Sequence, residues 1–548
     1  MEEKIKRMPM SENKHTNPST KNHAGSENKG KNQRKGLSRR DVLKSLATVP
    51  VLGALAYGVF RKQRYKKFLR RNILQETHMS GDTPSPVYFG EATGERLRLG
   101  IIGFGGRGEH LVRALGYPHP DVIDTWRKAA MENSNDKRFQ QYMNQPDLNV
   151  TINGVCDIFD VHAERALKAA SNKGRQGNKG TFSIPPKRYR HYSELIAAND
   201  IDAVVIATPD HWHAPMILEA AKAGKHVYVE KAMTRTVEEA FEVSRTVRKS
   251  NIIFQLGHQN RQTESYIKAE EAVKKNLLGN ISLIEVTTNR NSPVGAWVYP
   301  IHPQANKQTI DWEQFIEPTT NHPFSKERFF RWRCWWDYGT GLAGDLLTHE
   351  YDAVNQIMHL GIPHSAVASG GIYHYKDGRT VPDTLQVAYE YPEKDLTLLY
   401  SASLASRKDR GKIIMGHDGY MELGNTLHLY ADPRSTRYRK KIEKGIIDPS
   451  LPIYSYVPGK KSIDAVTSAT EKYFAGRGLL YTYRDGRRVD TTHLHMAEWI
   501  HGIRTGRQPS CNIERGFEEA ITAHMSSIAY RENTKVFWDE DNKKILKT

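Results

Sequence analysis

One glycine-rich turn constrains the fold of this chain more than any other feature. Residues 97–102 have the pattern of a buried strand, Gly103-Phe-Gly-Gly-Arg-Gly108 follows at once, and a helical pattern begins at Glu109. In such a G-x-G-x-x-G turn the first glycine allows the tight bend, the second lets the backbone approach a pyrophosphate, and the third lets the helix pack on the strand. The N–H groups of the helix then face the phosphate charge. The turn therefore predicts a dinucleotide site at Gly103, Gly105, Arg107 and Gly108.

An acidic residue at the end of the second strand commonly binds the ribose of the dinucleotide. The best match is Asp157, which ends the strand pattern of residues 150–157 and lies more than 50 residues after Gly103. The excess length falls in a polar stretch, residues 118–146, that we expect to form an inserted helical segment. A carboxylate here favours NAD over NADP because it repels a 2′-phosphate. The alternative role of Asp157 is the N-cap of the following helix.

Two further strand patterns end in polar residues. Residues 201–208 lead into Pro209-Asp-His-Trp-His213, and residues 225–229 lead into Glu230 and Lys231. Strands that alternate with helices form a doubly wound parallel sheet, which binds ligands at the carboxyl ends of its strands. No Cys or acidic partner stands at ligand spacing from the two histidines, so no metal is predicted. Beyond the glycine turn, the expected cofactor contacts are Asp157, Thr208, Pro209, His211, His213 and Glu230.

Taken in order, these motifs resemble the Gfo/Idh/MocA oxidoreductases, the family of glucose–fructose oxidoreductase and inositol dehydrogenase. Further matches run from Ala223 to Lys231, in Gly339-Thr-Gly-Leu-Ala-Gly-Asp345-Leu-Leu-Thr-His349 and from His501 to Pro509, so the resemblance covers residues 97 to about 540. It implies an α/β fold: a Rossmann domain that binds NAD, with NADP as the alternative, and then an α/β domain with a mostly antiparallel open sheet. It also implies hydride transfer from a hydroxyl of a sugar, cyclitol or glycoside.

The chain departs from the family at one position. The family usually carries Glu-Lys-Pro where this sequence has Glu230-Lys231-Ala232. A cis peptide bond after the lysine costs little before proline but about 2.5–4 kcal/mol before alanine. The placement of Lys231, and with it the role of this lysine, is therefore open.

Asp345 and His349 stand four residues apart in a stretch of helical periodicity, residues 344–360, so we expect both on one helix face. Oxidation of an alcohol needs a base and a group that orients it, and a histidine beside a carboxylate supplies both. The resemblance implies that Lys231, Asp345 and His349 form the catalytic trio. The alternative is a surface ion pair or a core histidine.

Three other residues are candidates for the substrate side. His258 and Arg261 follow a strand pattern that begins at Phe254, and we expect them to contact the sugar or the nicotinamide, with ordinary loop polarity as the alternative. Trp297 offers an aromatic face for a sugar ring, with core packing as the alternative. An H-E-x-x-H metalloprotease motif starting at His349 fails at Ala353, so no metal is required.

The formal charge of +18 is concentrated in the N-terminal arm. Residues 1–71 hold 19 basic and 5 acidic residues, whereas the other 477 residues hold 61 and 57. A body that binds nucleic acid therefore has no support. Residues 1–37 contain almost no large apolar side chain, so we expect them to be disordered. Three widely spaced cysteines predict neither a disulfide framework nor a zinc site.

A paired arginine near the N-terminus predicts export. Ser38-Arg39-Arg40 precedes an apolar stretch, residues 46–60, whose 15 residues are short for a membrane span. This pattern is typical of a twin-arginine signal, so we expect a periplasmic or exported protein. The alternative is an interfacial helix, and the seven basic residues in 61–71 would then bind anionic lipid. Membrane association through this segment is thus the second expectation.

The expected order is a basic arm (1–37), the signal or anchor (38–60), a basic segment and linker (61–96), the Rossmann domain (97–233), the substrate domain (234–425), an insertion (426–490) and C-terminal helices (491–548). The favoured activity is NAD(P)-dependent oxidation of a carbohydrate-like hydroxyl. Two alternatives stay open: a glycosidase that uses NAD for transient C3 oxidation and elimination, and a non-catalytic NAD-binding protein. The resemblance also allows a homo-oligomer that forms through the open sheet face.

Overall fold

The computed structural model describes residues 57–64, 79, 94–172, 185–408, 410–458, 481–484 and 487–548. The chain divides into two units, Met1–Phe68 and Leu69–Thr548. The arm expected at 1–37 and most of the signal expected at 38–60 lie outside the described residues; residues 57–64 are helical and exposed. Among the helices of the described segments, none combines the length and the apolar character needed to cross a bilayer.

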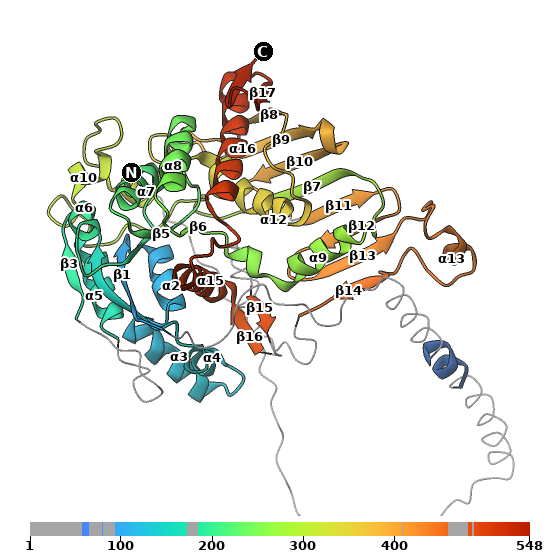
Figure 1. The fold of residues 1–548 in the computed structure, drawn as a ribbon, viewed down its shortest axis with the longest axis horizontal. Helices are drawn as coiled ribbons and strands as arrows, with labels where there is room; N and C mark the ends of the chain where they lie inside the picture. Colours follow the sequence, from blue (N-terminus) through green and yellow to red (C-terminus); the bar gives the residue numbers. More distant parts are fainter. Residues whose placement is uncertain are drawn as a thin grey trace, which may run out of the picture. The chain divides into compact units, whose positions relative to one another are not determined.

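The first half of the larger unit is a six-stranded parallel sheet in the order β3-β2-β1-β4-β5-β6 (Figure 1). Its apolar, β-branched strands are buried, as a sheet covered on both faces requires. The strands are β1 (Leu97–Ile102), β2 (Val150–Cys156), β3 (Lys187–Tyr189), β4 (Ala203–Ile206), β5 (His226–Val229) and β6 (Phe254–Leu256). The helices are α2 (Gly106–Ala114), α3 (Pro120–Glu132), α4 (Arg138–Met143), α5 (Asp160–Ala170), α6 (Tyr192–Ile196), α7 (His213–Lys222) and α8 (Val237–Lys249), with the short 3₁₀ turns η1 (Asp210–Trp212) and η2 (Gln259–Gln262).

The expected helical insertion at 118–146 is present as α3 and α4. The parallel sheet, however, does not end at residue 233, where the sequence placed the domain boundary. Helix α8 begins at a capping box formed by Thr236 and Glu239, and β6 then pairs with β5. The helix–strand alternation thus continues for one more unit, and the sheet reaches to residue 256.

The second half contains a ten-stranded sheet in the order β14-β13-β12-β11-β7-β10-β9-β8-β17-β18. Its neighbours pair antiparallel except for β7 and β10, so the predicted fold class is confirmed. The strands are β7 (Ile281–Asn289), β8 (Ser365–Gly371), β9 (Thr384–Tyr391), β10 (Leu396–Ser403), β11 (Lys412–Gly416), β12 (Gly419–Leu423), β13 (Leu427–Ala431), β14 (Tyr454–Tyr456), β17 (Val536–Asp539) and β18 (Lys544–Lys547).

Helices α9 (Glu264–Lys274), α12 (Thr348–Met358) and α16 (Ile513–Glu532) cover one face of this sheet (Figure 1). On the other face Val367 and Leu399 are 47% and 36% exposed, in agreement with the expected open face. The remaining short elements are α10 (Trp312–Ile316), α11 (Lys326–Phe330), α13 (Arg439–Glu443), the 3₁₀ turns η3 (Trp332–Cys334) and η5 (Pro392–Lys394), and the π-turn η4 (Ala343–Leu347).

The segment expected as an insertion, residues 426–490, is in part a continuation of the sheet. Strands β13 and β14 extend its edge, whereas β15 (Tyr481–Arg484) and β16 (Arg487–Asp490) form a separate hairpin. Helix α15 (Thr491–Thr505) then returns to the first half and packs on α2 and η2.

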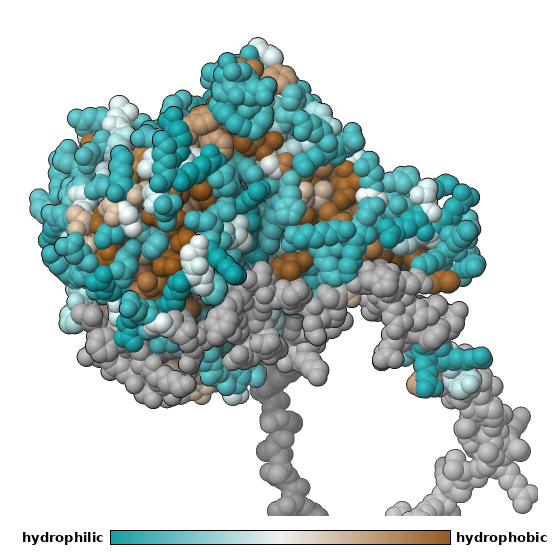
Figure 2. Space-filling model, in the orientation of Figure 1, coloured by the Kyte–Doolittle hydropathy of each residue, from teal (hydrophilic) through white to brown (hydrophobic). Residues whose placement is uncertain are grey.

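The two halves share a hydrophobic core. Met233 and Leu256 at the end of the parallel sheet belong to the same buried cluster as Phe517 and Ala520 of α16. The contact is so close that a Cβ on Gly516 would lie 2.8 Å from the Met233 sulfur. Outside this core, hydrophobic areas are interspersed with hydrophilic side chains on the face shown in Figure 2. The shared core fixes the parallel sheet against the second half, and the cavity between them is thereby held in shape.

Candidate active site

A cavity of about 780 Å³ lies between the carboxyl ends of the parallel strands and the second half. Its volume is in the range of cofactor and small-ligand sites. From the first half it is lined by residues that include Gly103, Gly105, Arg107, Asp157, Thr208, Pro209, Glu230 and Lys231. From the second half it is lined by residues that include Arg290, Tyr299, Trp332, Arg333, Asp345 and His349.

The glycine turn has the shape that a pyrophosphate needs. Gly103 has a φ of +86°, and a Cβ there would lie 2.7 Å from the Ala207 carbonyl oxygen. A Cβ on Gly108 would lie 2.2 Å from the Gly103 carbonyl oxygen, so α2 packs directly on the turn. Beside Gly105, by contrast, the space that a Cβ would enter is open. This open space at the N-terminus of α2 fits the phosphates of a dinucleotide.

Asp157 stands at the end of β2 and lines the cavity. Its Oδ2 accepts a hydrogen bond from the Phe104 backbone N–H at 2.6 Å, and its Oδ1 accepts one from the Phe159 N–H at 2.8 Å. The N-cap of α5 is Phe159, so Asp157 is not the helix cap that the sequence left open as an alternative. Its carboxylate instead joins the glycine turn to the end of β2, at the position expected for a ribose contact.

Arg107 and Glu230, both expected cofactor contacts, are paired with each other. The Arg107 Nε lies 2.8 Å from Glu230 Oε1, and its Nη2 donates to Gln259 Oε1 at 2.9 Å. Both side chains line the cavity. Because the guanidinium is already engaged, the backbone of the glycine turn remains the better candidate for the phosphates.

The two histidines of the Pro209–His213 segment support the backbone rather than line the cavity. The His213 ring bridges two carbonyl oxygens, with Nδ1 2.6 Å from Ala232 and Nε2 2.9 Å from Thr208. The His211 Nε2 lies 2.8 Å from the Phe315 carbonyl oxygen, and burial lowers the pKa of His211 to about 3. These contacts differ from the expected cofactor contacts because α7 and η1 turn both rings into the protein. Thr208 and Pro209 do line the cavity.

Lys231 reaches the second half and pairs with Asp345. Its Nζ donates to Asp345 Oδ1 at 2.9 Å and to the Asp345 carbonyl oxygen at 2.5 Å. The Lys231–Ala232 peptide bond is cis, although alanine replaces the family proline. Asp345 Oδ1 also accepts from Arg333 Nε at 2.9 Å, and Oδ2 accepts from the Trp297 indole at 3.0 Å.

These contacts engage both carboxylate oxygens of Asp345. Burial would raise the pKa of its carboxyl, but the charges of Lys231 and Arg333 outweigh burial and hold the pKa well below its ordinary value. The carboxylate is therefore ionised and fixes the lysine and the arginine at the cavity wall. Trp297, considered above as a stacking platform for a sugar, is buried and holds this carboxylate.

His349 lines the cavity without a hydrogen bond to the described residues, and its Nδ1 is buried. Burial, with the nearby charge of Lys231, holds the pKa of His349 well below its ordinary value, so the imidazole is neutral at neutral pH. The sequence predicted that Asp345 orients this ring, but the Asp345 oxygens are occupied by cations and by Trp297. The cause is local: Asp345 lies in the π-turn η4 and His349 in α12, so their spacing is not that of one α-helix. We call Lys231, Arg333, Asp345 and His349 the cavity cluster.

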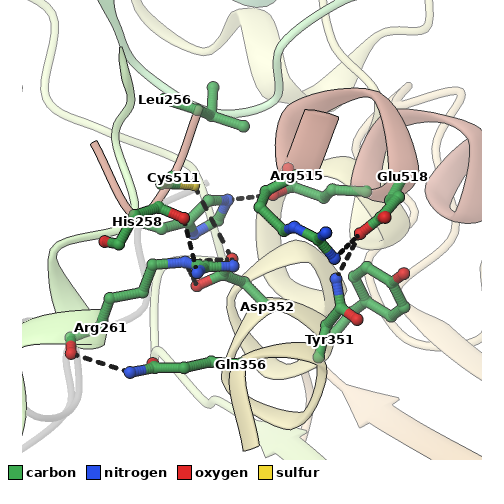
Figure 3. A network of polar contacts seen from close by, with 12 residues as sticks. Leu256, His258, Arg261, Tyr351, Asp352, Gln356, Cys511, Arg515 and Glu518 are labelled. Atoms are coloured by element: carbon green, nitrogen blue, oxygen red, sulfur yellow. Dashed lines mark hydrogen bonds and ion pairs between the residues drawn. The ribbon is translucent and has the colours of Figure 1, made fainter. Parts of the chain in front are cut away.

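Behind His349 lies a second group of buried charges, His258, Arg261, Asp352 and Glu519, which we call the wall cluster. Arg261 donates to Asp352 Oδ1 through Nε at 2.8 Å and through Nη2 at 2.6 Å (Figure 3). The His258 Nε2 contacts the Glu519 carboxylate. His258 and Arg261 were expected to contact the substrate, but neither lines the cavity, because each side chain is buried against its carboxylate partner.

The wall cluster contains a geometry that a metal could use. Ligand atoms of His258, Asp352 and Glu519 lie within 4.8 Å of one another. The Arg261 guanidinium, however, already occupies Asp352 and would repel a cation. Within the described residues the carboxylates of the wall cluster are thus neutralised by Arg261 and His258, and we assign no metal site there. Its link to the cavity is the His258 ring, whose centroid lies 5.3 Å from that of His349 at an angle of 90°.

Sequence reasoning did not identify Arg290 or Arg333, which both line the cavity. Arg333 lies in η3, and only the packing of this turn brings it to Asp345. Arg290 directly follows β7.

Family models match most of this chain. Residues 97–258 match the model described as "Oxidoreductase family, NAD-binding Rossmann fold", and residues 316–536 match the model of its "C-terminal alpha/beta domain". A curated relative, levoglucosan dehydrogenase of Pseudarthrobacter phenanthrenivorans, is 29% identical over 225 residues, which are 39% of this chain and 47% of that protein. A glycosyl hydrolase family 109 protein of Shewanella baltica is 33% identical over 101 residues, 18% of this chain and 21% of that one. The chain thus spans about half, or a fifth, of the length of these relatives.

Solved structures share the fold. Levoglucosan dehydrogenase in complex with NADH and levoglucosan has a TM-score of 0.52 at 17% identity, over 81% of this chain and 99% of that one. The WlbA dehydrogenase of Bordetella pertussis, in complex with NADH and UDP-GlcNAcA, has a TM-score of 0.52 at 15% identity, over 81% and 98%. Together with the geometry of the glycine turn, the family models show that this chain belongs to the Gfo/Idh/MocA oxidoreductases, with an NAD-binding Rossmann domain and the C-terminal α/β domain of that family.

Proposed function

We propose that this protein is an NAD-dependent oxidoreductase that takes hydride from a hydroxyl-bearing carbon of a sugar, cyclitol or glycoside. The observation that carries the proposal is that one cavity is lined by the glycine turn and by Lys231, Asp345 and His349. A dinucleotide bound on the turn and a substrate bound at the cavity cluster would thus share one enclosed space. The levoglucosan dehydrogenase relative supports a carbohydrate-like substrate.

The residues of the cavity cluster have complementary roles in this reaction. The neutral His349 imidazole accepts the hydroxyl proton, because it has no hydrogen-bond partner among the described residues. The Lys231 ammonium, held by Asp345, donates to the same oxygen and stabilises the charge that develops there. When bound, NAD supplies the acceptor for the hydride that leaves the carbon. The product is a carbonyl compound, with the proton on His349.

The test is to add sugars, cyclitols and glycosides to the purified protein and to follow reduced nicotinamide by its absorbance. The expected result is substrate-dependent reduction, which Lys231→Ala abolishes. If no member of a broad panel reduces the cofactor and none is cleaved, the proposal fails.

A second candidate is a glycosidase that uses NAD without net redox change. The similarity to glycosyl hydrolase family 109 proteins favours it. Hydride removal from C3 would acidify the neighbouring C–H, the glycosidic bond would be eliminated, and return of the hydride after water addition would restore NAD. Of the carboxylates that line the cavity, Asp345 pairs with Lys231 and Glu230 with Arg107, so neither of these two is free for direct hydrolysis. Release of nitrophenol from nitrophenyl glycosides, with no net change in NADH, would distinguish this candidate from the first.

We further propose that the protein is exported folded by the twin-arginine pathway, carries its dinucleotide with it, and acts in the periplasm or at the membrane. The support is Ser38-Arg39-Arg40 upstream of the glycine turn in one chain. Denaturing protein purified from the periplasm or membrane fraction should release close to one dinucleotide per chain. A large shortfall, with activity strictly dependent on added NAD, or a cytoplasmic location of both wild type and Arg39→Lys, would contradict this proposal.

Sedimentation of the same material would test whether copies associate through the open sheet face.

A further inference from the structure

The substrate end of the cavity has more positive than negative charge. Lys231, Arg290 and Arg333 line it from three separate segments, and the carboxyl groups near them are Asp345 and Asp210. Lys231 and Arg333 both bind Asp345 Oδ1, at 2.9 Å each. The Arg290 guanidinium forms no hydrogen bond or ion pair with the residues that the structure describes, although its charge acts on Asp345 and on His349. Arg290 is thus a cation at the cavity wall that forms no direct ion pair with the described residues.

The main chain holds Arg290 in place. The residue directly follows β7, its N–H donates to the Ser403 carbonyl oxygen at 2.9 Å, and its own carbonyl oxygen accepts from the Ser406 N–H at 3.1 Å. The side chain is half-buried.

Arg290 and the expected phosphate site belong to different halves of the protein. The glycine turn and Asp157 belong to the parallel sheet, at strand ends β1 and β2. Arg290 belongs to the second half and shares its neighbourhood with Asp345 and His349. Arg290 therefore lines the part of the cavity that the second half contributes, together with Asp345 and His349.

We infer that the substrate carries an anionic group, the carboxylate of a uronic acid or a sulfate ester, which Arg290 binds. The inference rests on the proposed function, and it narrows the substrate from carbohydrates in general to anionic ones. A guanidinium presents two parallel N–H donors that match two oxygens of a carboxylate or sulfate. In a partly buried site a hydrogen bond to a charged group also contributes more than one between neutral groups.

The test compares matched ligands that differ in charge. Methyl glycosides of glucose and galactose are assayed beside the corresponding methyl uronosides and 6-sulfates, and oxidation and cleavage are both followed. We expect kcat/KM for the preferred anionic member to exceed that of its neutral match at least about tenfold. Arg290→Gln should lower this ratio about tenfold or more, toward equal values for the two members, as the loss of a charge-assisted hydrogen bond predicts. Arg290→Lys should fall between the two, because it keeps the charge but loses the two-pronged geometry. The control is Arg407→Gln, an exposed arginine of the loop after β10, which should leave the ratio unchanged.

Equal rates for neutral and anionic members, or an unchanged ratio in Arg290→Gln, would overturn the inference and leave the proposed function standing. A preference for uronosides over sulfates, or the reverse, identifies which anion is bound. If no glycoside reacts, calorimetric titration of the NAD-loaded protein with methyl uronosides and 6-sulfates decides separately. Binding that Arg290→Gln weakens at least tenfold supports the anion site, and equal binding to both proteins overturns it.

Discussion

The cavity cluster and the wall cluster are neighbouring groups of buried charges, but they are built differently. Their histidines, His349 and His258, face each other with ring centroids 5.3 Å apart. Burial and Lys231 lower the pKa of His349, whereas for His258 the charges of Glu519 and Asp352 outweigh burial and raise the pKa. The pKa values of two neighbouring imidazole rings are thus shifted in opposite directions, because the charged groups around each ring differ.

The difference shows what separates a site from a structural network. In the wall cluster each cation contacts a carboxylate, Arg261 with Asp352 and His258 with Glu519. In the cavity cluster His349 lacks a described partner, and Arg290 beside it lacks one too. Burial and shifted pKa values occur in both clusters, so neither alone marks a functional residue. Unused hydrogen-bonding capacity that faces a cavity is the better mark.

The largest expected effect is in the wall cluster. Arg261→Ala should lower the free energy of unfolding by about 3–5 kcal/mol, because it leaves Asp352 buried and unpaired. The matched control is Arg248→Ala, which breaks an ion pair with Glu514 whose side chains are about half exposed and should cost less than about 1 kcal/mol. Urea unfolding of both variants measures the difference. Equal costs would remove the structural role assigned to the wall cluster.

The next effect is on turnover. Lys231→Ala, Asp345→Ala and His349→Ala should each lower turnover about 100-fold or more. The first removes the donor to the substrate oxygen, the second removes the carboxylate that holds this donor, and the third removes the proton acceptor. Their stability should change less than that of Arg261→Ala, because water in the cavity can solvate the groups left behind. Kinetics and thermal unfolding are measured on the same samples. Near wild-type activity in any two of the three would remove the proposed site.

A smaller effect is expected at the cofactor end. Asp157→Ala should raise the Kd for NAD about tenfold and weaken discrimination against NADP, because the charge that repels a 2′-phosphate is lost. Asp157→Asn loses the same charge but keeps an oxygen for the Phe104 or Phe159 N–H, so it should lose discrimination with a smaller loss of affinity. Calorimetric titration with both dinucleotides measures this. An unchanged preference would limit Asp157 to holding the turn.

The smallest effect concerns pH. The folded pKa of His349 lies below its ordinary value of 6.5, so the base stays deprotonated through that pH and kcat/KM should fall only under more acidic conditions. The same pKa shift affects the free energy of unfolding. Below pH 6.5 the His349 side chain takes up a proton in the unfolded chain but not in the folded chain, so its contribution lowers stability as the pH drops.

The double variant His258→Gln/Glu519→Gln tests whether the clusters are coupled. It removes the His258 charge, which lowers the pKa of His349, together with the carboxylate that this charge neutralises. The acid limb of the kcat/KM profile should then move to higher pH, by less than the full distance to 6.5, because burial and Lys231 still act. A limb that does not move would mean that the two clusters are independent.

The sequence predicted the fold well where local rules apply. The first strand was expected at residues 97–102 and is β1. The domain boundary predicted at residue 233 was less accurate, because the alternation of helix and strand continues past it. Helix α8 and strand β6 extend the parallel sheet beyond that residue. For the site, sequence and family resemblance brought Lys231, Asp345 and His349 to one place, but not their contacts. They also proposed His258 and Arg261 for the substrate, which the structure places behind the cavity wall.

The amino-acid sequence by itself determined the glycine turn, because its requirements are steric and local. Gly103 must take a positive φ, and a side chain at Gly108 would collide with the Gly103 carbonyl oxygen. Tertiary structure alone decided how the charges pair. Lys231 and Asp345 are separated by 114 residues, and only the packing of the two halves on a shared core sets the distance between them. Coulomb interactions depend on that distance and on burial, neither of which is written in the order of residues. For the same reason Asp345 binds Lys231, Arg333 and Trp297, while His349 and Arg290 are left to face the cavity.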